Sequence, residues 1–428
     1  MPTHSASTPA QANYALLVLL LAYILSFIDR NVMAVLIGPI RAQFDISDFQ
    51  YSLLHGFAFS MFYLALGLPI ARWADRGNRK WIIGLGIFIW SIMTCLCGLA
   101  RNVTTLFLAR VGVGIGEAGC SPPAHSMIAD LYPPEQRSTA MGFYTLGISA
   151  GIMVAYLAGG WVVENIGWRE AFFIVGIPGV LLAIIVRFTV IGPPRGHSEN
   201  RADKGEGPPI LAVFRFLLER RSFLHMAVGA GLSSFAGYAV ISFFPSFIVR
   251  SYDMQIVLLG TWLGLILGIA GGLGFFSGGF FADYFGRSRQ RNALLFIAAT
   301  QLAAAAVSIG VYLAPTAHAA LLLFILPAII SNFYLAPVLA QTQSLVPLRM
   351  RGVASAIVLL IINLIGLGLG PFVVGGLSDL FEPRFGEESL RYALMLAVLV
   401  VTTWAALHYL LASRTIEDDL AGAKESAQ

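Results

Sequence analysis

Charged residues are scarce in this chain, and that scarcity limits what the chain can be. Asp, Glu, Lys and Arg make up only 12% of its 428 residues, whereas 57% are hydrophobic and the mean hydropathy is +0.77. A soluble protein of this length needs far more polar surface to face water. The composition therefore excludes an ordinary soluble protein and predicts one that crosses a membrane several times.

Several sequence patterns that carry chemistry are also missing. The three cysteines all lie in apolar runs, and they form neither a disulfide framework nor a Cys/His metal site with the usual spacing. No segment resembles a Walker A loop, and no nucleophile–base set stands out. We therefore expect neither an enzyme nor a protein that depends on a metal, another cofactor or a nucleic-acid partner.

Long apolar runs are what the sequence has instead. A helix needs about 20 mostly apolar residues to cross the hydrocarbon core of a bilayer. The sequence contains twelve runs of about this length, which predict an all-α integral membrane protein with twelve transmembrane helices in two six-helix bundles. The predicted spans are residues 14–37, 50–72, 81–100, 103–130, 138–161, 168–191, 222–250, 257–283, 292–313, 317–345, 351–378 and 389–413.

The basic residues indicate how the chain is oriented. With both termini in the cytoplasm, 19 of the 27 Lys and Arg residues lie in the inner loops, the linker and the tails, and Arg30 and Arg110 remain inside the membrane. Positive charge gathers on the cytoplasmic side of membrane proteins. We therefore expect a multi-pass protein of the plasma (inner) membrane with both termini cytoplasmic.

A polar segment divides the chain near its middle. Residues 192–209 are rich in Pro, Gly and mixed charge, as in a linker. The next residues, "ILAVFRFLLERRSF", either form an amphipathic helix on the inner leaflet or simply begin the seventh span. The expected parts are a tail at 1–13, a bundle at 14–191, a linker at 192–221, a bundle at 222–413 and a tail at 414–428.

The two halves share motifs at matching positions. "ARWADRGNRK" (71–80) follows the second span and "GGFFADYFGRSR" (278–289) follows the eighth, and a second pair of related loops follows the fourth and tenth spans. Two matched pairs indicate an internal repeat. The arrangement resembles the major facilitator superfamily, although Asn78 stands where the loop of that family usually has glycine.

The first two spans resemble one branch of that superfamily more closely. "FIDRNVMAVLIGPI" in the first span and "SDFQYSLL" at the start of the second are similar to the spinster-like transporters. This resemblance implies a secondary carrier that works by alternating access. Animal members are associated with sphingosine-1-phosphate and lysophospholipids.

Three charged residues within the first and fourth spans form the candidate coupling site. By helix rise, Asp29 and Arg110 lie roughly 12 and 10 Å below the outer surface, so each can offset the cost of burying the other. Glu117 lies two turns beyond Arg110 on the same helix face. The resemblance implies a proton-coupling role for Asp29 and Arg110, with Glu117 as an accessory. For Arg30 we favour a structural role, either against a neighbouring helix or reaching towards outer water.

The histidines of the membrane segments are weaker candidates for carrying a proton. Single histidines more often satisfy local hydrogen bonds, so we expect His55 and His125 to have structural roles.

Acidic residues in the repeated loops are candidates for a cytoplasmic gate. Asp75 and Asp283 lie at helix ends beside basic clusters, where each can meet the positive N-terminus of another helix. The resemblance implies a latch on the cytoplasmic side in the outward-open state, and a simple loop salt bridge is the alternative. The predicted gate residues are Asp75, Arg76, Arg79, Lys80, Asp283, Arg287, Arg137 and Arg351.

The second half has neutral polar residues and aromatics in its spans, which suits an amphiphilic substrate. A charged head would lie near Arg110 and an apolar tail against Phe243 and Phe244, although most such aromatics only pack. The candidate cavity residues are Arg110, Tyr238, Phe243, Phe244, Asn332, Tyr334 and Asn363.

We therefore predict a proton-linked secondary transporter, a monomer in the lipid bilayer, for an amphiphilic, anionic, lipid-like solute. The alternatives are a proton-coupled transporter of a small organic anion or drug and, with less support, a non-transporting membrane receptor.

Overall fold

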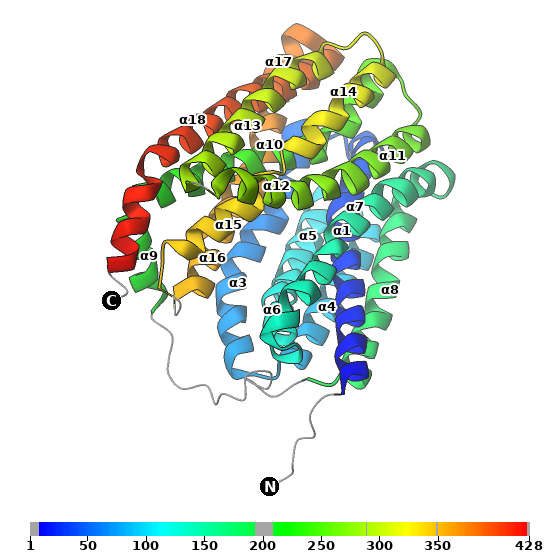
Figure 1. Ribbon diagram of the computed structural model, residues 1–428. Coiled ribbons are helices and arrows are strands. Elements are labelled where there is room, and N and C mark those ends of the chain that lie inside the picture. Colours follow the sequence, from blue (N-terminus) through cyan, green and yellow to red (C-terminus); the bar gives the residue numbers. More distant parts are fainter. Residues whose placement is uncertain (1–7, 193–208, 288, 348–349, 426–428) are drawn as a thin grey trace. The chain divides into compact units, whose positions relative to one another are not determined.

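The computed structural model describes residues 8–192, 209–287, 289–347 and 350–425, and within these ranges every regular element is a helix (Figure 1). Ten helical stretches of the described chain are long and apolar enough to cross a membrane. One of them, Arg351–Ala423, contains the last two predicted spans, and the predicted span at 50–72 coincides with further helix. The predicted all-α membrane fold is confirmed.

The chain folds into two compact units. Unit 1 consists of Met1–Ile46, Leu53–Gly205 and Ile256–Gly264, and unit 2 of Ser47–Ser52, Glu206–Gln255 and Leu265–Gln428. Each unit is therefore built largely from one half of the sequence, with one short segment taken from the other half.

Unit 1 is a bundle in which α4 packs along α8 and α1 along α7. Its first helix begins at a capping box, in which Thr8 and Gln11 satisfy each other's backbone N–H groups. Pro122 lies where the chain breaks between α5 and α6, as expected of a residue that cannot continue a helix. The elements are α1 (Pro9–Phe44), η1 (Leu53–Phe57), α3 (Ala58–Arg76), α4 (Arg79–Gly98), α5 (Val103–Ala118), α6 (Ser121–Leu131), α7 (Pro134–Asn165), α8 (Trp168–Thr189) and most of α11 (Ile256–Leu265).

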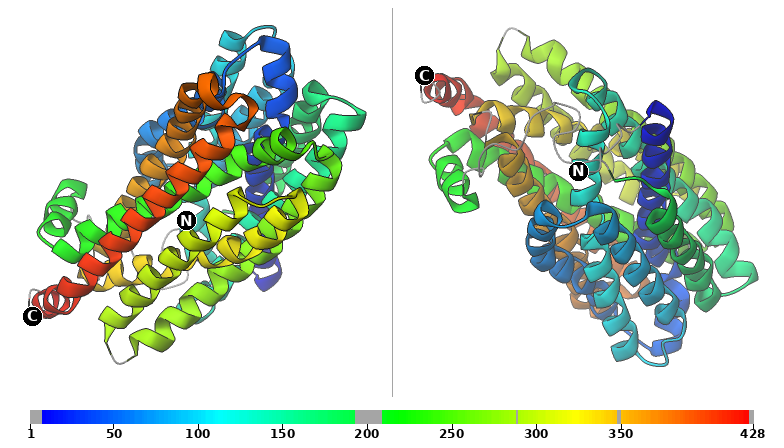
Figure 2. Two further views of the ribbon diagram at one scale, coloured as in Figure 1. Left: turned by 90° about the horizontal axis from the view of Figure 1, so that it is seen from above. Right: turned by 90° about the horizontal axis from the view of Figure 1, so that it is seen from below.

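Unit 2 is a bundle in which the final helix lies along α10 and α13 (Figure 2). The elements are α2 (Asp48–Ser52), α9 (Ile210–Leu218), α10 (Arg221–Tyr252), η3 (Ile266–Ala270), α12 (Gly271–Gly286), α13 (Gln290–Tyr312), α14 (Ala317–Ile330), α15 (Leu335–Ser344), α16 (Arg351–Asn363), η5 (Leu364–Leu369), α17 (Gly370–Phe385), η6 (Gly386–Glu388) and α18 (Ser389–Glu425).

The segment after the linker is a helix separate from the seventh span. In α9, Val213 and Leu217 are buried in the core of unit 2, whereas Arg215 is exposed. This two-sided pattern fits the amphipathic alternative.

The last helix continues past residue 413, where the predicted span ends. It reaches Glu425, and Asp419 accepts hydrogen bonds from the backbone N–H and the hydroxyl of Ser222 at the start of α10. An acidic residue at a helix N-terminus is favourable because it meets unsatisfied N–H groups. The polar end of the chain thus docks on unit 2 as helix.

Candidate functional site

The first buried ion pair of unit 1 joins α1 to α5. An Arg110 Nη donates to Asp29 Oδ1 at 2.9 Å, and the side chains are 1% and 0% exposed. The hydroxyl of Thr94, on α4, donates to the other oxygen of Asp29. The predicted contact between Asp29 and Arg110 is confirmed, and three helices meet at this carboxylate.

A second ion pair lies beside the first and uses the next residue of α1. Arg30 Nε lies 2.5 Å from Glu117 Oε2, which also accepts a hydrogen bond from the hydroxyl of Ser26 at 2.8 Å. Glu117 therefore pairs with Arg30, and its accessory role in proton coupling stays a prediction. Arg30 is turned inward and does not reach towards outer water, which corrects that alternative.

Aromatic rings hold the guanidinium of Arg30 in place. Its central carbon lies 5.1 Å from the ring centroid of Phe27, 5.0 Å from that of Phe59 and 4.9 Å from that of Tyr63. Rings at this distance attract a cation through their negative faces. Arg30 is thus enclosed by one carboxylate and three rings.

Glycines let α5 approach its neighbours closely enough for these pairs to form. A Cβ on Gly114 would lie 2.5 Å from the carbonyl oxygen of Phe59, and one on Gly116 would lie 2.4 Å from the backbone nitrogen of Trp90. This helix packs closely on its neighbours, because their backbone atoms occupy the space that side chains at these positions would need.

The four charges balance one another, which makes their burial tolerable. Isolated ions in an apolar interior are costly, and a pair is stable only when hydrogen bonds satisfy the remaining atoms. Two polar atoms, Arg110 Nε and Glu117 Oε1, have no hydrogen-bond partner among the described residues. A proton or an anion arriving here would find one open donor and one open acceptor.

Neither histidine candidate forms part of these ion pairs. His55 is buried in the π-helical segment η1, and the ring of His125 lies edge-on to that of Tyr144 at 5.3 Å. Their expected structural roles stay predictions.

The predicted gate residues of unit 1 have different surroundings. Arg79 is buried and donates to Asp130 and, at 3.0 Å, to the hydroxyl of Ser126. It therefore links α4 to α6 within unit 1, and Asp130 is a partner that the sequence reading missed. The side chains of the other three, Asp75, Arg76 and Arg137, lie outside the described part of the structure, whereas that of Lys80 is half-buried.

The predicted gate residues of unit 2 are exposed. Asp283 and Arg287 lie at the end of α12, where the guanidinium of Arg287 stands 5.9 Å from the ring centroid of Tyr284, and Arg351 begins α16. The latch itself stays a prediction.

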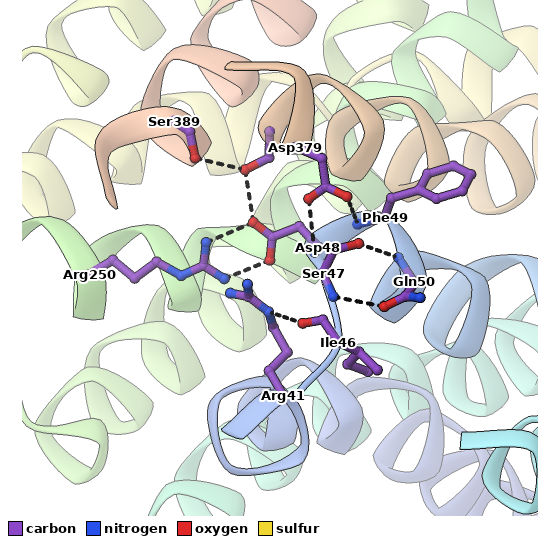
Figure 3. Close-up of polar contacts among 10 residues, drawn as sticks. Arg41, Ile46, Ser47, Asp48, Phe49, Gln50, Arg250, Asp379 and Ser389 are labelled. Atoms are coloured by element: carbon purple, nitrogen blue, oxygen red, sulfur yellow. Dashed lines mark hydrogen bonds and ion pairs between the residues drawn. The ribbon is translucent and has the colours of Figure 1, made fainter. Parts of the chain in front are cut away.

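A cluster that sequence reasoning missed anchors α2 in unit 2 (Figure 3). Two nitrogens of Arg250 donate to the two oxygens of Asp48 at 2.7 and 2.6 Å, and the hydroxyl of Ser378 donates to the same carboxylate at 2.8 Å. Asp379 accepts from the backbone N–H groups of Asp48 and Phe49. A bidentate pair and a capped helix N-terminus together hold this short segment.

The candidate tail contacts of the substrate are core residues in this structure. Phe243 and Phe244 are fully buried, and Phe244 stacks on Phe324 with ring centroids 4.3 Å apart. A substrate tail would reach them only if these rings separated, so their role stays a prediction.

Two of the polar cavity candidates donate to a backbone carbonyl four residues earlier in the chain. The side-chain nitrogen of Asn332 donates to the carbonyl of Ala328, and that of Asn363 to the carbonyl of Leu359. Tyr334 is buried in the core of unit 2 and Tyr238 is half-buried.

Comparison with known proteins identifies the family. A model described as the Major Facilitator Superfamily matches residues 19–371. The chain belongs to the major facilitator superfamily. It is therefore a multi-pass membrane protein of a transporter family, and the resemblance stated from its first two spans is confirmed by spinster relatives.

Two curated proteins and one solved structure illustrate the likeness within this superfamily. The chain is 33% identical to an MFS-type efflux pump of Mycolicibacterium smegmatis over 96% of its length and 95% of the relative's. It is 27% identical to protein spinster homolog 1 of Xenopus tropicalis, covering 90% of this chain and 78% of that one. A crystal structure of a bacterial homolog to the human lysosomal transporter spinster, inward-facing and unoccupied, matches with a TM-score of 0.85 at 33% identity, covering 96% and 99%.

Proposed function

We propose that this chain is a proton-linked secondary transporter that moves an amphiphilic, anionic, lipid-like solute by alternating access. The observation that carries the proposal is the set of two ion pairs between α1 and α5, whose carboxylates are both fully buried. Ionisable side chains inside a membrane are costly and mark ion or substrate pathways. A structural clasp would need only one such pair.

Proton transfer to Asp29 would break the first pair. A neutral carboxyl no longer offsets the charge of Arg110, so Arg110 would seek another anion or a more hydrated position. An anionic head group could take the place of the carboxylate, and Arg110 would bind it with its planar fork. Proton binding and substrate binding would then be linked through one guanidinium.

The second pair gives the transport cycle a second carboxylate, Glu117, that could accept a proton. Glu117 has one oxygen without a hydrogen-bond partner among the described residues, and its cation is held by rings rather than by a second carboxylate. Protonation of Glu117 would leave Arg30 partly stabilised by these rings. We therefore assign the main coupling role to Asp29 and the accessory role to Glu117.

The substrate class rests on the relatives and on chemistry. The resemblance to the spinster-like transporters, whose animal members are associated with lysophospholipids, supports a lipid-like solute. The name efflux pump of one relative supports the runner-up, a small organic anion or drug. We place both termini on the cytoplasmic side of the plasma membrane, because positive charge favours that side. We also expect the protein to be a monomer.

Asp29→Asn tests the proposal because it mimics the protonated carboxyl permanently. Label distances across the protein, measured at acidic and neutral pH, should change with pH in the parent and much less in the variant. Proton-driven uptake into proteoliposomes should be lost while downhill exchange survives. A variant that responds to pH as fully as the parent would remove Asp29 from the coupling step, and Glu117→Gln would be the next variant.

A further inference from the structure

Two positive charges of unit 1 lie close together without a carboxylate to neutralise them. Lys80 is the second residue of α4 and Arg187 lies near the end of α8, and these two helices pack along each other. The guanidinium of Arg187 lies over the ring of Trp81, the residue that directly follows Lys80. Among the described residues, no carboxylate pairs with either one, whereas the adjacent Arg79 is neutralised by Asp130.

Exposed aromatic side chains lie against Arg187. The guanidinium of Arg187 lies 4.2 Å from the ring centroid of Trp81 and 5.3 Å from that of Phe188, and these rings are 51% and 74% exposed. Nearby, the hydroxyls of Tyr14 and Thr189 share a hydrogen bond of 2.6 Å. Exposed Trp and Tyr are typical of the zone where lipid head groups meet the hydrocarbon.

An apolar path leads from the two cations along both helices. Below Trp81, Leu85 and Phe88 follow on the same face of α4 and are 38% and 45% exposed. Below Phe188, Ile184 and Leu181 continue the same face of α8. Residues spaced by three or four positions line one side of a helix. The two cations thus lie at one end of an exposed apolar surface formed by α4 and α8.

We propose that Lys80 and Arg187 bind the head-group phosphate of an anionic phospholipid in the leaflet on the side of the chain's N-terminus. Two neighbouring cations repel each other, and an anion between them removes that repulsion. Basic pockets between transmembrane helices bind anionic head groups in this way. The acyl chains would lie on the apolar surface of α4 and α8, and the site is independent of the buried pairs described above.

Native mass spectrometry of the whole protein in neutral detergent tests the site. Phosphatidylglycerol and phosphatidylcholine with the same acyl chains are titrated against the parent, Lys80→Gln/Arg187→Gln and the control Arg101→Gln/Arg414→Gln. The control removes two exposed cations for which no carboxylate partner is found among the described residues. We expect phosphatidylglycerol binding about tenfold weaker in the site variant, unchanged in the control, and phosphatidylcholine binding equal in all three.

Two further measurements separate the remaining explanations. Lys80→Glu changes the local charge by as much as the double variant does, at a side chain that makes no ion pair among the described residues, so it should fold and bind phosphatidylglycerol about as weakly as the site variant. Inorganic phosphate should not compete with the lipid, because it lacks acyl chains. Equal phosphatidylglycerol binding in the site and control variants would overturn the proposal, and so would full competition by phosphate, which would indicate a free-anion site.

Discussion

Replacing Asp48 by asparagine should loosen α2 from unit 2 while hardly changing the shape of the side chain. The carboxylate accepts two hydrogen bonds from Arg250 and one from Ser378, and its side chain is 3% exposed. An asparagine offers a single oxygen, and its NH₂ group would face a guanidinium that cannot accept a hydrogen bond. The variant therefore loses the ion pair and at least one further bond.

The size of the effect follows from the burial of the two partners. Removing one member of a buried ion pair costs about 3–5 kcal/mol. Arg250 is 19% exposed and regains some water, so the lower end, about 3 kcal/mol, applies. Because 1.4 kcal/mol is a factor of ten, local opening of α2 should become about 100-fold more frequent.

Hydrogen–deuterium exchange of the peptide that covers residues 47–52 measures this opening. The backbone N–H groups of Asp48 and Phe49 are held by Asp379, so they exchange only when the segment leaves its seat. Asp253→Asn is the matched control, since Asp253 is exposed at the end of α10 in the same unit. Unchanged exchange in Asp48→Asn would refute the reasoning, and so would an equal rise in the control.

Three other substitutions have expected outcomes that follow from the contacts. Gly114→Ala should reduce the free energy of unfolding by about 1–3 kcal/mol, seen as a lower unfolding temperature, because the added Cβ would meet backbone atoms. Gly142→Ala should not lower it, because no atom lies within 4 Å of the added Cβ. Arg110→Lys should retain part of the transport rate that Arg110→Ala abolishes, since lysine keeps the charge but loses the planar fork; full uptake by the alanine variant would contradict this. Asp419→Ala should cost about 1–2 kcal/mol in thermal unfolding by uncapping α10, whereas the exposed Asp418 should tolerate the same change; equal melting of the two variants would count against the cap.

The pair of Asp29 and Arg110 could be predicted from the sequence because their depths match and the family resemblance implies a shared coupling role for them. Each lies a countable number of residues from a membrane boundary, and helix rise converts that count into a depth. Matching depths allow two such charges on neighbouring helices to offset each other's burial. Two such residues in an apolar chain leave few other pairings.

The pair of Arg30 and Glu117 could not be predicted in this way. Depth does not say how a helix is turned about its axis, and that rotation decides which of two adjacent residues meets a given neighbour. On α1, Asp29 and Arg30 are about 100° apart, so each faces a different point on α5. The aromatic rings around Arg30 belong to α1 and α3, and the hydropathy pattern does not predict that they surround the same guanidinium.

The contacts that hold α2 in unit 2 could not be predicted from the sequence for a further reason. Asp48 and Arg250 are 202 residues apart, and both stand at helix ends, where apolar periodicity stops and charged residues are ordinary. A sequence therefore predicts the spans and the charges that a membrane cannot tolerate unpaired, because both follow from the bilayer. Contacts between helix ends depend on which helices the fold places next to each other. Charged residues at helix ends are expected whether or not they form ion pairs. Asp48 became a candidate for function only when the structure placed Arg250, Ser378 and Asp379 around it.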